Sequence, residues 1–319
     1  LTLCRRRNRN GKVTTMQLKN FKHDHPAVAR LQRSLRPYGY LSPVMLLMLA
    51  LLFVPIILVI GYSFFDNVLI KPHPQWVGLQ NYIEVLTDPV FLKSMKNTAV
   101  FVVCNVVFHL VIGMTLALMV NAKCLRPTPK AIFRVIYLLP WMFNATVIAI
   151  LWKLLLNPNG IVNYLLVNAH IISEKISWLS DRSIVLGVLT FINIWAGYPF
   201  YMISILAGLQ GISGNLYEAA AIDGARPVQQ FFHITLPQLK PILISIAMLD
   251  FIWTTQNFSL IWLLTAGGPS HATEMMSTYV YTTAFMEYQY ARASAAAVII
   301  LLACVILAIF YVRNQTRTD

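Results

Sequence analysis

The chain has 319 residues, of which 57% are hydrophobic and only 12% are charged, where soluble domains carry about 25% charged residues. A soluble protein this apolar could not cover its surface with polar groups, so the composition excludes an ordinary soluble enzyme and indicates a membrane protein. The net charge of +13 lies mostly at the N-terminus without a nucleic-acid-binding motif, which favours a role in membrane orientation over nucleic-acid binding.

Residues 1–43 form a basic segment with no apolar periodicity, and we expect a cytoplasmic N-terminal arm here. The first long apolar stretch begins after this arm, is longer than the apolar part of a signal peptide, and lacks a persuasive cleavage site. We therefore interpret it as a membrane span. At the other end, residues 313–319 are expected to be a short cytoplasmic tail.

Six stretches are long and apolar enough to cross a bilayer, which requires about 20 residues in a helix. They are roughly 44–65, 98–121, 133–156, 184–209, 241–265 and 290–312. Lipid offers no hydrogen-bond partner to backbone groups, and no alternation typical of a barrel is present, so these stretches must be helices. The predicted fold is an all-α integral membrane protein whose six-helix domain covers residues 44–312.

Lys and Arg residues are distributed unequally between the two sets of connections. The N-terminal arm, the second and fourth connections and the C-terminus hold eighteen, whereas the first, third and fifth connections hold five. Cytoplasmic loops carry the excess of Lys and Arg. Both termini are therefore predicted to be cytoplasmic.

The cytoplasmic connection at residues 210–240 is unusually apolar for a loop. Its first part predicts a short helix with a small apolar face and acidic neighbours, formed by Leu216, Glu218, Ala219, Ala220 and Asp223. Gly224 is expected to end this helix, and a second apolar group containing Ile234 and Leu236 is expected to end at Pro237. An exposed apolar face needs lipid or a protein to cover it, and acidic residues beside it favour a protein.

The spacing of Glu218-Ala219-Ala220, Gly224 and Ile234-x-Leu236-Pro237 resembles the EAA motif of ABC importer permeases. Three further segments resemble the maltose-type first permease subunit of the carbohydrate-uptake branch: Val77-Gly78-Leu79-Gln80-Asn81-Tyr82, Asn157-Pro158-Asn159-Gly160-Ile161-Val162-Asn163 and Leu264-Thr265-Ala266-Gly267-Gly268-Pro269. The resemblance covers roughly residues 44–312. It implies a permease subunit in the bacterial inner membrane that imports a sugar or oligosaccharide by alternating access.

The same resemblance implies which residues couple transport to ATP hydrolysis: Leu216, Glu218, Ala219, Ala220, Asp223, Gly224, Ile234, Leu236 and Pro237. The sequence contains no Gly-x4-Gly-Lys-Ser/Thr, so we expect no cofactor in this chain, with ATP and Mg²⁺ on two partner ATPase subunits. The other implied partners are a second permease subunit, an external substrate-binding protein, membrane lipid and the carbohydrate itself.

Polar residues within spans usually face the bundle interior or a water-filled cavity. By the resemblance, the substrate pathway is lined by Trp141, Ala145, Asn193, Gly197, Phe200, Trp253, Thr254 and Asn257. Amide groups and aromatic rings suit a sugar, although Trp253 and Thr254 differ from the maltose-type residues. The alternative is that these residues serve interhelical packing, with asparagine as a hydrogen-bonding contact.

Two ionisable residues within spans need separate explanations. Asp250 must be paired or hydrated at membrane depth, and we expect pairing with a neighbouring subunit. His109 is interpreted as a lone structural residue. The sequence suggests neither a nucleophile–base pair nor metal-ligand spacing, which argues against a membrane-embedded enzyme.

Two other solute classes remain open. An importer of glycerol-phosphate type shares the same motifs, and an acidic oligosaccharide such as alginate or oligogalacturonate would suit Lys71, His73 and Arg292 near the outer mouth. A membrane receptor is a further alternative, against which the EAA motif argues.

Overall fold

The computed structural model describes residues 38, 40–66, 69–122 and 127–315. These residues form helices and loops, with one isolated β-bridge between Phe65 and Trp76 and no strand in the described ranges. The chain divides into two units between Ile57 and Leu58, and the cavity, loops and helix packing discussed below lie in the second unit. The all-helical prediction is confirmed for this part of the chain. Most of the expected N-terminal arm and C-terminal tail lie outside the described residues.

Within the described ranges, five helices are long and apolar enough to cross a membrane, and one bent pair is a sixth candidate. They are Tyr40–Tyr62, containing η1 (Leu49–Phe53) and α2 (Val54–Tyr62); α4 (Pro89–Asn121); the pair α5 (Pro127–Met142) and α6 (Ala145–Leu155); α8 (Val185–Gly211); Pro227–Thr255, containing α10 (Pro227–Gln230), η2 (Phe231–Thr235) and α11 (Leu236–Thr255); and α14 (Tyr290–Gln315). Shorter helices connect them: α3 (Gln80–Thr87), α7 (Ile161–Asn168), α9 (Gly214–Ile222), α12 (Ser259–Thr265), α13 (Met276–Tyr281) and η3 (Thr282–Met286). The first, second, fourth and sixth predicted spans each correspond to one helix.

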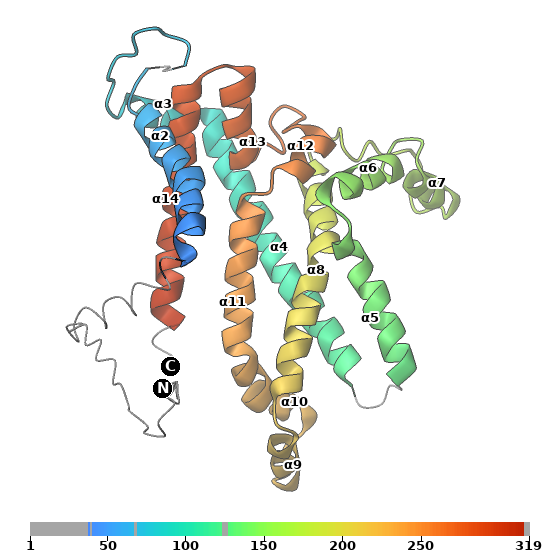
Figure 1. Cartoon of the computed structure of the whole chain (residues 1–319). Helices are drawn as coiled ribbons and strands as arrows, with labels where there is room; N and C mark the ends of the chain where they lie inside the picture. The colour runs from blue at the N-terminus through green and yellow to red at the C-terminus, as the bar shows by residue number, and fades with distance from the viewer. Residues whose placement is uncertain (1–37, 39, 67–68, 123–126, 316–319) are drawn as a thin grey trace, which may run out of the picture. The chain divides into compact units, whose positions relative to one another are not determined.

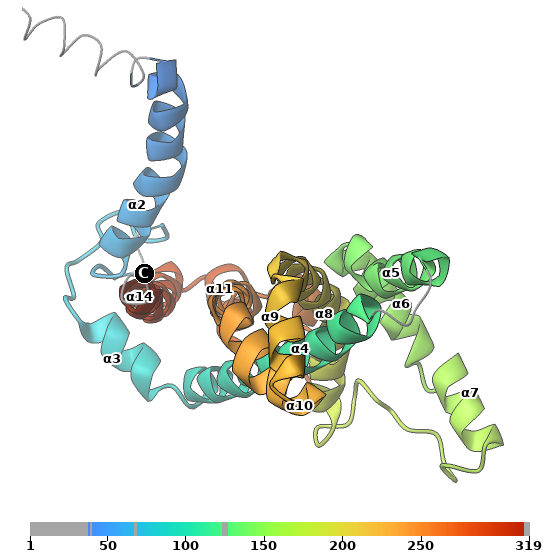
Figure 2. The ribbon, with the colours of Figure 1, turned by 90° about the horizontal axis from the view of Figure 1, so that it is seen from below.

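Helices α4, α8 and α11 lie side by side at the centre of the second unit (Figures 1 and 2). Fully buried side chains of α8 fill the space between them, among them Tyr201, Met202 and Ile205. Gly113 of α4 faces this row, and a Cβ there would lie 2.4 Å from the Tyr201 Cβ. The close packing of α4 on α8 therefore depends on a glycine at this position.

The third predicted span, 133–156, is wrong as a single helix. It is divided into α5 and α6, which meet at an angle of 95°. Asn144 begins the second piece, because its side chain accepts a hydrogen bond from the Val147 backbone N–H at 2.9 Å. The apolar pattern continues across the break, so hydropathy alone does not reveal it.

The fifth predicted span, 241–265, is also corrected. The helix runs from Pro227 through Pro237 to Thr255, and the remaining residues form the separate α12. Pro237 does not end the second apolar group, because it occupies the first turn of α11 after the π-helical turn η2. A proline inside a helix lacks the N–H needed for the regular backbone hydrogen bonds, and the π-helical turn directly before Pro237 is where that regular pattern is interrupted.

Buried asparagines hold the loops that carry the conspicuous sequence segments. Asn81 donates to the backbone carbonyls of Ser63 and Phe65. Asn163 donates to the Ile176 carbonyl and accepts from the Trp178 indole N–H. Each asparagine side chain takes the place of water as the hydrogen-bond partner of backbone groups that would otherwise be unpaired. The sequence segments that contain Asn81 and Asn163 therefore hold the loops in a fixed conformation.

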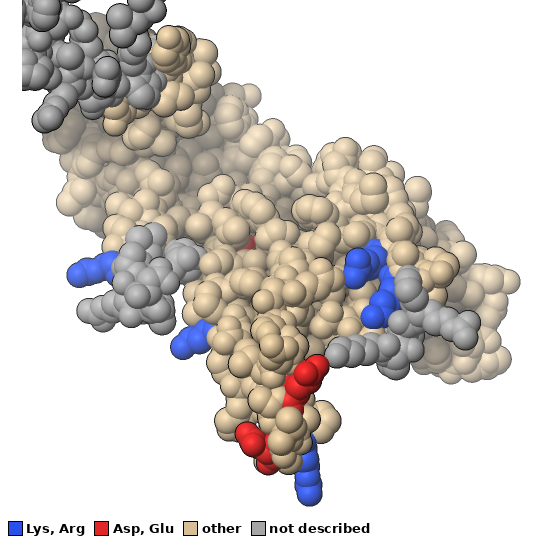
Figure 3. All heavy atoms as spheres, turned by 60° about the horizontal axis from the view of Figure 1, so that its bottom comes forward, with Lys and Arg blue, Asp and Glu red and all other residues tan. Residues whose placement is uncertain are grey.

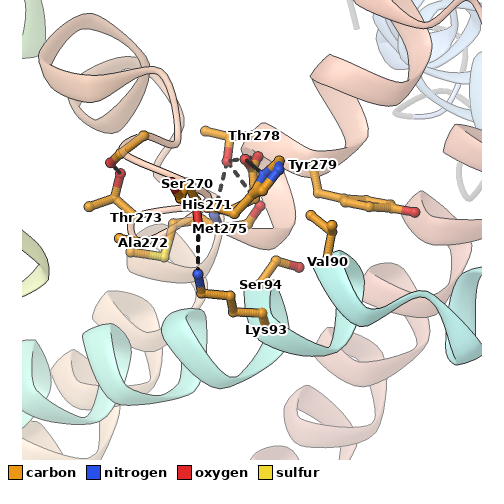
Figure 4. A network of polar contacts seen from close by, with 12 residues as sticks. Val90, Lys93, Ser94, Ser270, His271, Ala272, Thr273, Met275, Thr278 and Tyr279 are labelled. Atoms are coloured by element: carbon orange, nitrogen blue, oxygen red, sulfur yellow. Dashed lines mark hydrogen bonds and ion pairs between the residues drawn. The ribbon is translucent and has the colours of Figure 1, made fainter. Parts of the chain in front are cut away.

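The loop before α13 is fastened to α4 in the same way (Figure 4). Asn97 of α4 donates to the carbonyls of Ala272 and Glu274, and the Lys93 ammonium donates to the carbonyl of Ser270 at 2.9 Å. The buried Glu274 carboxylate in turn accepts a hydrogen bond from Thr278. The loop is thus a fixed part of the helical core.

Tyr279 in α13 is buried and only 4% exposed. Its hydroxyl donates to Asp88 at 2.7 Å, and Asp88 also caps the start of α4. Burial, together with this carboxylate, raises the pKa of the Tyr279 hydroxyl, so the group remains a donor at neutral pH.

We predict that Gly113→Ala lowers the thermal stability of the purified protein, because the new methyl group overlaps Tyr201 and the Met202 backbone. Overpacking of this kind costs about 1–3 kcal/mol. Gly187→Ala in α8 is the matched control, since a Cβ there meets nothing within 4 Å. Equal thermal stability of the two variants in detergent would contradict this account of the α4–α8 contact.

Candidate functional site

A cavity of about 260 Å³ lies between the central helices and the bent α5–α6 pair. It is lined by His109, Trp141, Phe143, Ala145, Ile148, Asn193, Ala196, Gly197, Asp250, Trp253, Thr254, Asn257 and Leu260. All the residues expected along the substrate pathway are present except Phe200. The expected pathway did not include His109, Asp250 or the apolar members Phe143, Ile148, Ala196 and Leu260.

A chain of amide groups crosses one wall of the cavity. The Asn257 side chain donates to the Asn193 side-chain oxygen at 2.8 Å, and the Asn193 amide donates to the Asn105 side-chain oxygen at 2.8 Å. Asn105 is buried and donates to the carbonyl of Phe101 in its own helix. The chain therefore joins α4, α8 and the end of α11, and it fixes which way each amide points.

A second polar group lies deeper in the wall, around the Asp250 carboxylate. His109 Nδ1 lies 2.8 Å from one carboxylate oxygen, to which the Tyr201 hydroxyl also donates at 3.0 Å. Thr254 donates to the other oxygen at 2.9 Å. The expectation that Asp250 pairs with a neighbouring subunit is wrong, because its partners come from α4, α8 and α11 of the same chain. His109 is likewise not a lone residue.

The protonation of this pair follows from its hydrogen bonds. The His109 Nε2 atom lies 3.2 Å from the Asn193 backbone carbonyl, which can only accept, so Nε2 carries a proton. The short contact between Nδ1 and Asp250 needs a further proton between them, since two lone pairs would repel. Whichever atom holds that proton, the pair has no net charge.

Gly197 is required for this arrangement. A Cβ at this position would lie 2.4 Å from His109 Nε2, so any larger residue would displace the imidazole. Asn105 and His109 are spaced i and i+4 on one face of α4. That spacing of two polar residues in an apolar span is the sequence signal that could have revealed them.

Aromatic rings form the other side of the cavity. Trp141 and Trp253 are both about half exposed, and each has its ring near Phe200, at 6.2 and 5.4 Å between centroids. Phe200 does not line the cavity but lies between the two indoles and supports them. The apolar ring faces and the amide groups thus bound the same space.

The connection at residues 210–240 forms the expected short helix, α9. Gly224 has φ +81° and follows its last turn, where the N–H groups of Gly224 and Ala225 bond to the carbonyls of Ala221 and Ala220. This pattern is the Schellman motif, which favours glycine at that position. The prediction that Gly224 ends the helix is confirmed.

Helix α9 has no buried residue. The residues that were expected to couple transport to ATP hydrolysis are exposed or half-buried: Leu216, Glu218, Ala219, Ala220, Asp223, Gly224, Ile234, Leu236 and Pro237. Figure 3 shows acidic and basic side chains on this protruding segment. A hydrogen bond of 2.8 Å between the hydroxyls of Tyr217 and Thr235 fastens α9 to η2, and so to the long helix that reaches the cavity.

Comparison with known proteins covers most of the chain. Residues 109–319 match the family described as binding-protein-dependent transport system inner membrane component. A probable ABC transporter permease of Bacillus subtilis, YurN, is 31% identical over 88% of this chain and 96% of its own length. The trehalose/maltose transport system permease of Thermococcus litoralis is 32% identical over 81% of this chain and 87% of its own length.

A solved bacterial ABC transporter involved in the import of the acidic polysaccharide alginate has a similar fold. Its matching chain superposes with a TM-score of 0.78 at 24% identity, covering 90% of this chain and 99% of that one. At this identity the likeness concerns the fold alone.

We predict that His109→Leu destabilises the protein by about 3–5 kcal/mol, because it leaves a buried carboxylate without its partner. The double variant His109→Leu/Asp250→Leu should be at least as stable as the single one, since no charge is then buried. Thermal unfolding of both variants in detergent measures this. Additive losses in the double variant would show that the two residues do not act as a pair.

Proposed function

Because the chain belongs to the family of binding-protein-dependent transport system inner membrane components, we propose that it is the sugar-translocating permease subunit of an ABC importer. The observation that supports this most is the cavity, in which amide groups and two indole rings meet between spanning helices. Amides suit the hydroxyl groups of a sugar, and the rings suit its C–H faces. Relatives named for trehalose/maltose and lactose transport point to the same solute class.

In this proposal, both termini and α9 lie in the cytoplasm. The support is the excess of Lys and Arg in the connections on that side. The asparagine-locked loops then face outward, where a substrate-binding protein delivers the solute. A related solved complex contains an alginate-bound periplasmic protein together with its transporter.

Two ATPase subunits bind and hydrolyse ATP with Mg²⁺ in the proposed complex. The exposed helix α9 offers a docking element for one of them, with Glu218 available to a basic partner residue. A second permease subunit completes the assembly. The volume of the cavity, about 260 Å³, is slightly below the usual range of about 300–1,000 Å³ for ligand sites. This suits a site of which the present chain forms only one side and the second permease subunit the other.

Transport would proceed by alternating access. ATP-driven closure of the ATPases moves α9, and the helix Pro227–Thr255 carries that movement to the cavity wall. Purification of the native complex tests the proposal. An ATPase and a second permease should co-purify, and uptake should require ATP; a chain that purifies alone and transports without ATP would overturn it.

We predict that Glu218→Lys and Gly224→Pro leave membrane insertion intact but abolish solute-stimulated ATP hydrolysis in proteoliposomes. The first reverses a charge on α9, and the second forces φ from +81° to about −65° at the helix end. Gly211→Ala is the control, because a Cβ there meets nothing within 4 Å. Normal solute-stimulated ATP hydrolysis in both variants would contradict the coupling role of α9.

We predict that Asn257→Ala reduces uptake through the loss of a hydrogen bond worth about 0.5–1.5 kcal/mol. Trp253→Ala should reduce it further, because an aromatic wall of the cavity is removed. Assembly with the ATPase and basal ATP hydrolysis should survive in both. Uptake per assembled complex, measured beside a melting curve, distinguishes this result from packing defects, in which uptake and assembly fall together.

A further inference from the structure

The cavity contains ionisable side chains that already neutralise one another. Among its lining residues only His109 and Asp250 carry ionisable groups, and His109 Nδ1 lies 2.8 Å from an Asp250 carboxylate oxygen. Both carboxylate oxygens are further occupied by the Tyr201 and Thr254 hydroxyls. The wall described here therefore offers no free cation to a solute.

The polar groups that remain for a solute are uncharged and of mixed type. In the described part of the chain, the Asn257 amide uses one N–H for Asn193, while its oxygen has no donor. The Thr254 hydroxyl donates to Asp250 and keeps its acceptor lone pairs. Such a set both donates and accepts, which matches hydroxyl groups; a carboxylate or phosphate only accepts.

The outer cations that would favour an acidic solute have acidic partners. Lys71 pairs with Asp66 at 2.5 Å, and Arg292 lies 3.3 Å from Asp88 and 3.7 Å from Glu84. These contacts compensate the charges of Lys71 and Arg292, two of the three residues that suggested an acidic oligosaccharide in the sequence.

We propose that the His109–Asp250 pair makes this permease selective for uncharged, hydroxyl-rich solutes and excludes carboxylated or phosphorylated ones. The inference rests on the proposed function and narrows its solute class. An anion that enters the cavity would lose its hydration beside the Asp250 carboxylate. The His109 imidazole could not balance its charge, because it is already paired with that carboxylate. Asp250 thereby acts as a specificity determinant through the imidazole that it holds.

The test compares two disaccharides of similar size, neutral maltose and anionic digalacturonate. Each is titrated into the complete transporter in nanodiscs without the binding protein, and quenching of tryptophan fluorescence reports occupancy, because Trp141 and Trp253 line the cavity. The unmodified complex should bind maltose more tightly by a factor on the order of a hundred, the scale of discrimination that a misplaced polar group produces.

Asp250→Asn should reduce this preference at least about tenfold, because it removes the carboxylate that opposes an anion and leaves the His109 imidazole without its acidic partner. Asp250→Asn/His109→Gln should restore the preference, since none of the cavity-lining residues named above then carries an ionisable group. The control is Thr255→Ala, whose hydroxyl bonds to the Phe251 carbonyl and does not line the cavity. A purely structural role of Asp250 would lower the affinity for both sugars and leave their ratio unchanged.

The inference is overturned if digalacturonate binds as tightly as maltose, if the ratio is unchanged in Asp250→Asn, or if neither maltose, trehalose nor lactose binds. These outcomes differ from a failure of the proposed function. A chain that assembles with no ATPase refutes the importer, whereas an assembled ATP-driven complex that prefers digalacturonate refutes only the solute class.

Discussion

The arrangement of the central helices depends on keeping one buried carboxylate paired. Asp250 lies in apolar surroundings where an unpaired charge is strongly unfavourable, and its partners come from three helices. This requirement places His109 of α4 against α11 and leaves room only for glycine at position 197. These polar contacts join the helices at the wall of the cavity.

The loops held by buried asparagines follow the same physical rule. Asn81, Asn97 and Asn163 are buried, and each pairs with backbone groups of a loop that has no regular structure to satisfy them. The segments that carried the family resemblance outside the EAA motif are therefore mainly architectural. They hold the loops in place, whereas most residues that line the cavity lie within the spanning helices.

Hydropathy predicted the helical class and the single-helix spans because apolar length is a direct requirement of the bilayer. It could not predict the break at Asn144, where a cap interrupts an unbroken apolar run, or the passage of a helix through Pro237. The family pattern located the cavity residues but not the partner of Asp250. Such pairing joins residues 141 positions apart, and one sequence shows only that a partner is needed.

The continuous helix from Pro227 to Thr255 also gives the chain a mechanical property. Its 29 residues make a rod about 43 Å long, at about 1.5 Å per residue. If it pivots near Pro241, a tilt of about ten degrees shifts Asp250 by roughly 2 Å, in the direction opposite to the displacement of Pro227. The distances from Pro241 to Pro227 and to Asp250 thus set the ratio of their displacements. A helical turn inserted on either side of Pro241 would change that ratio and so the movement of the cavity wall.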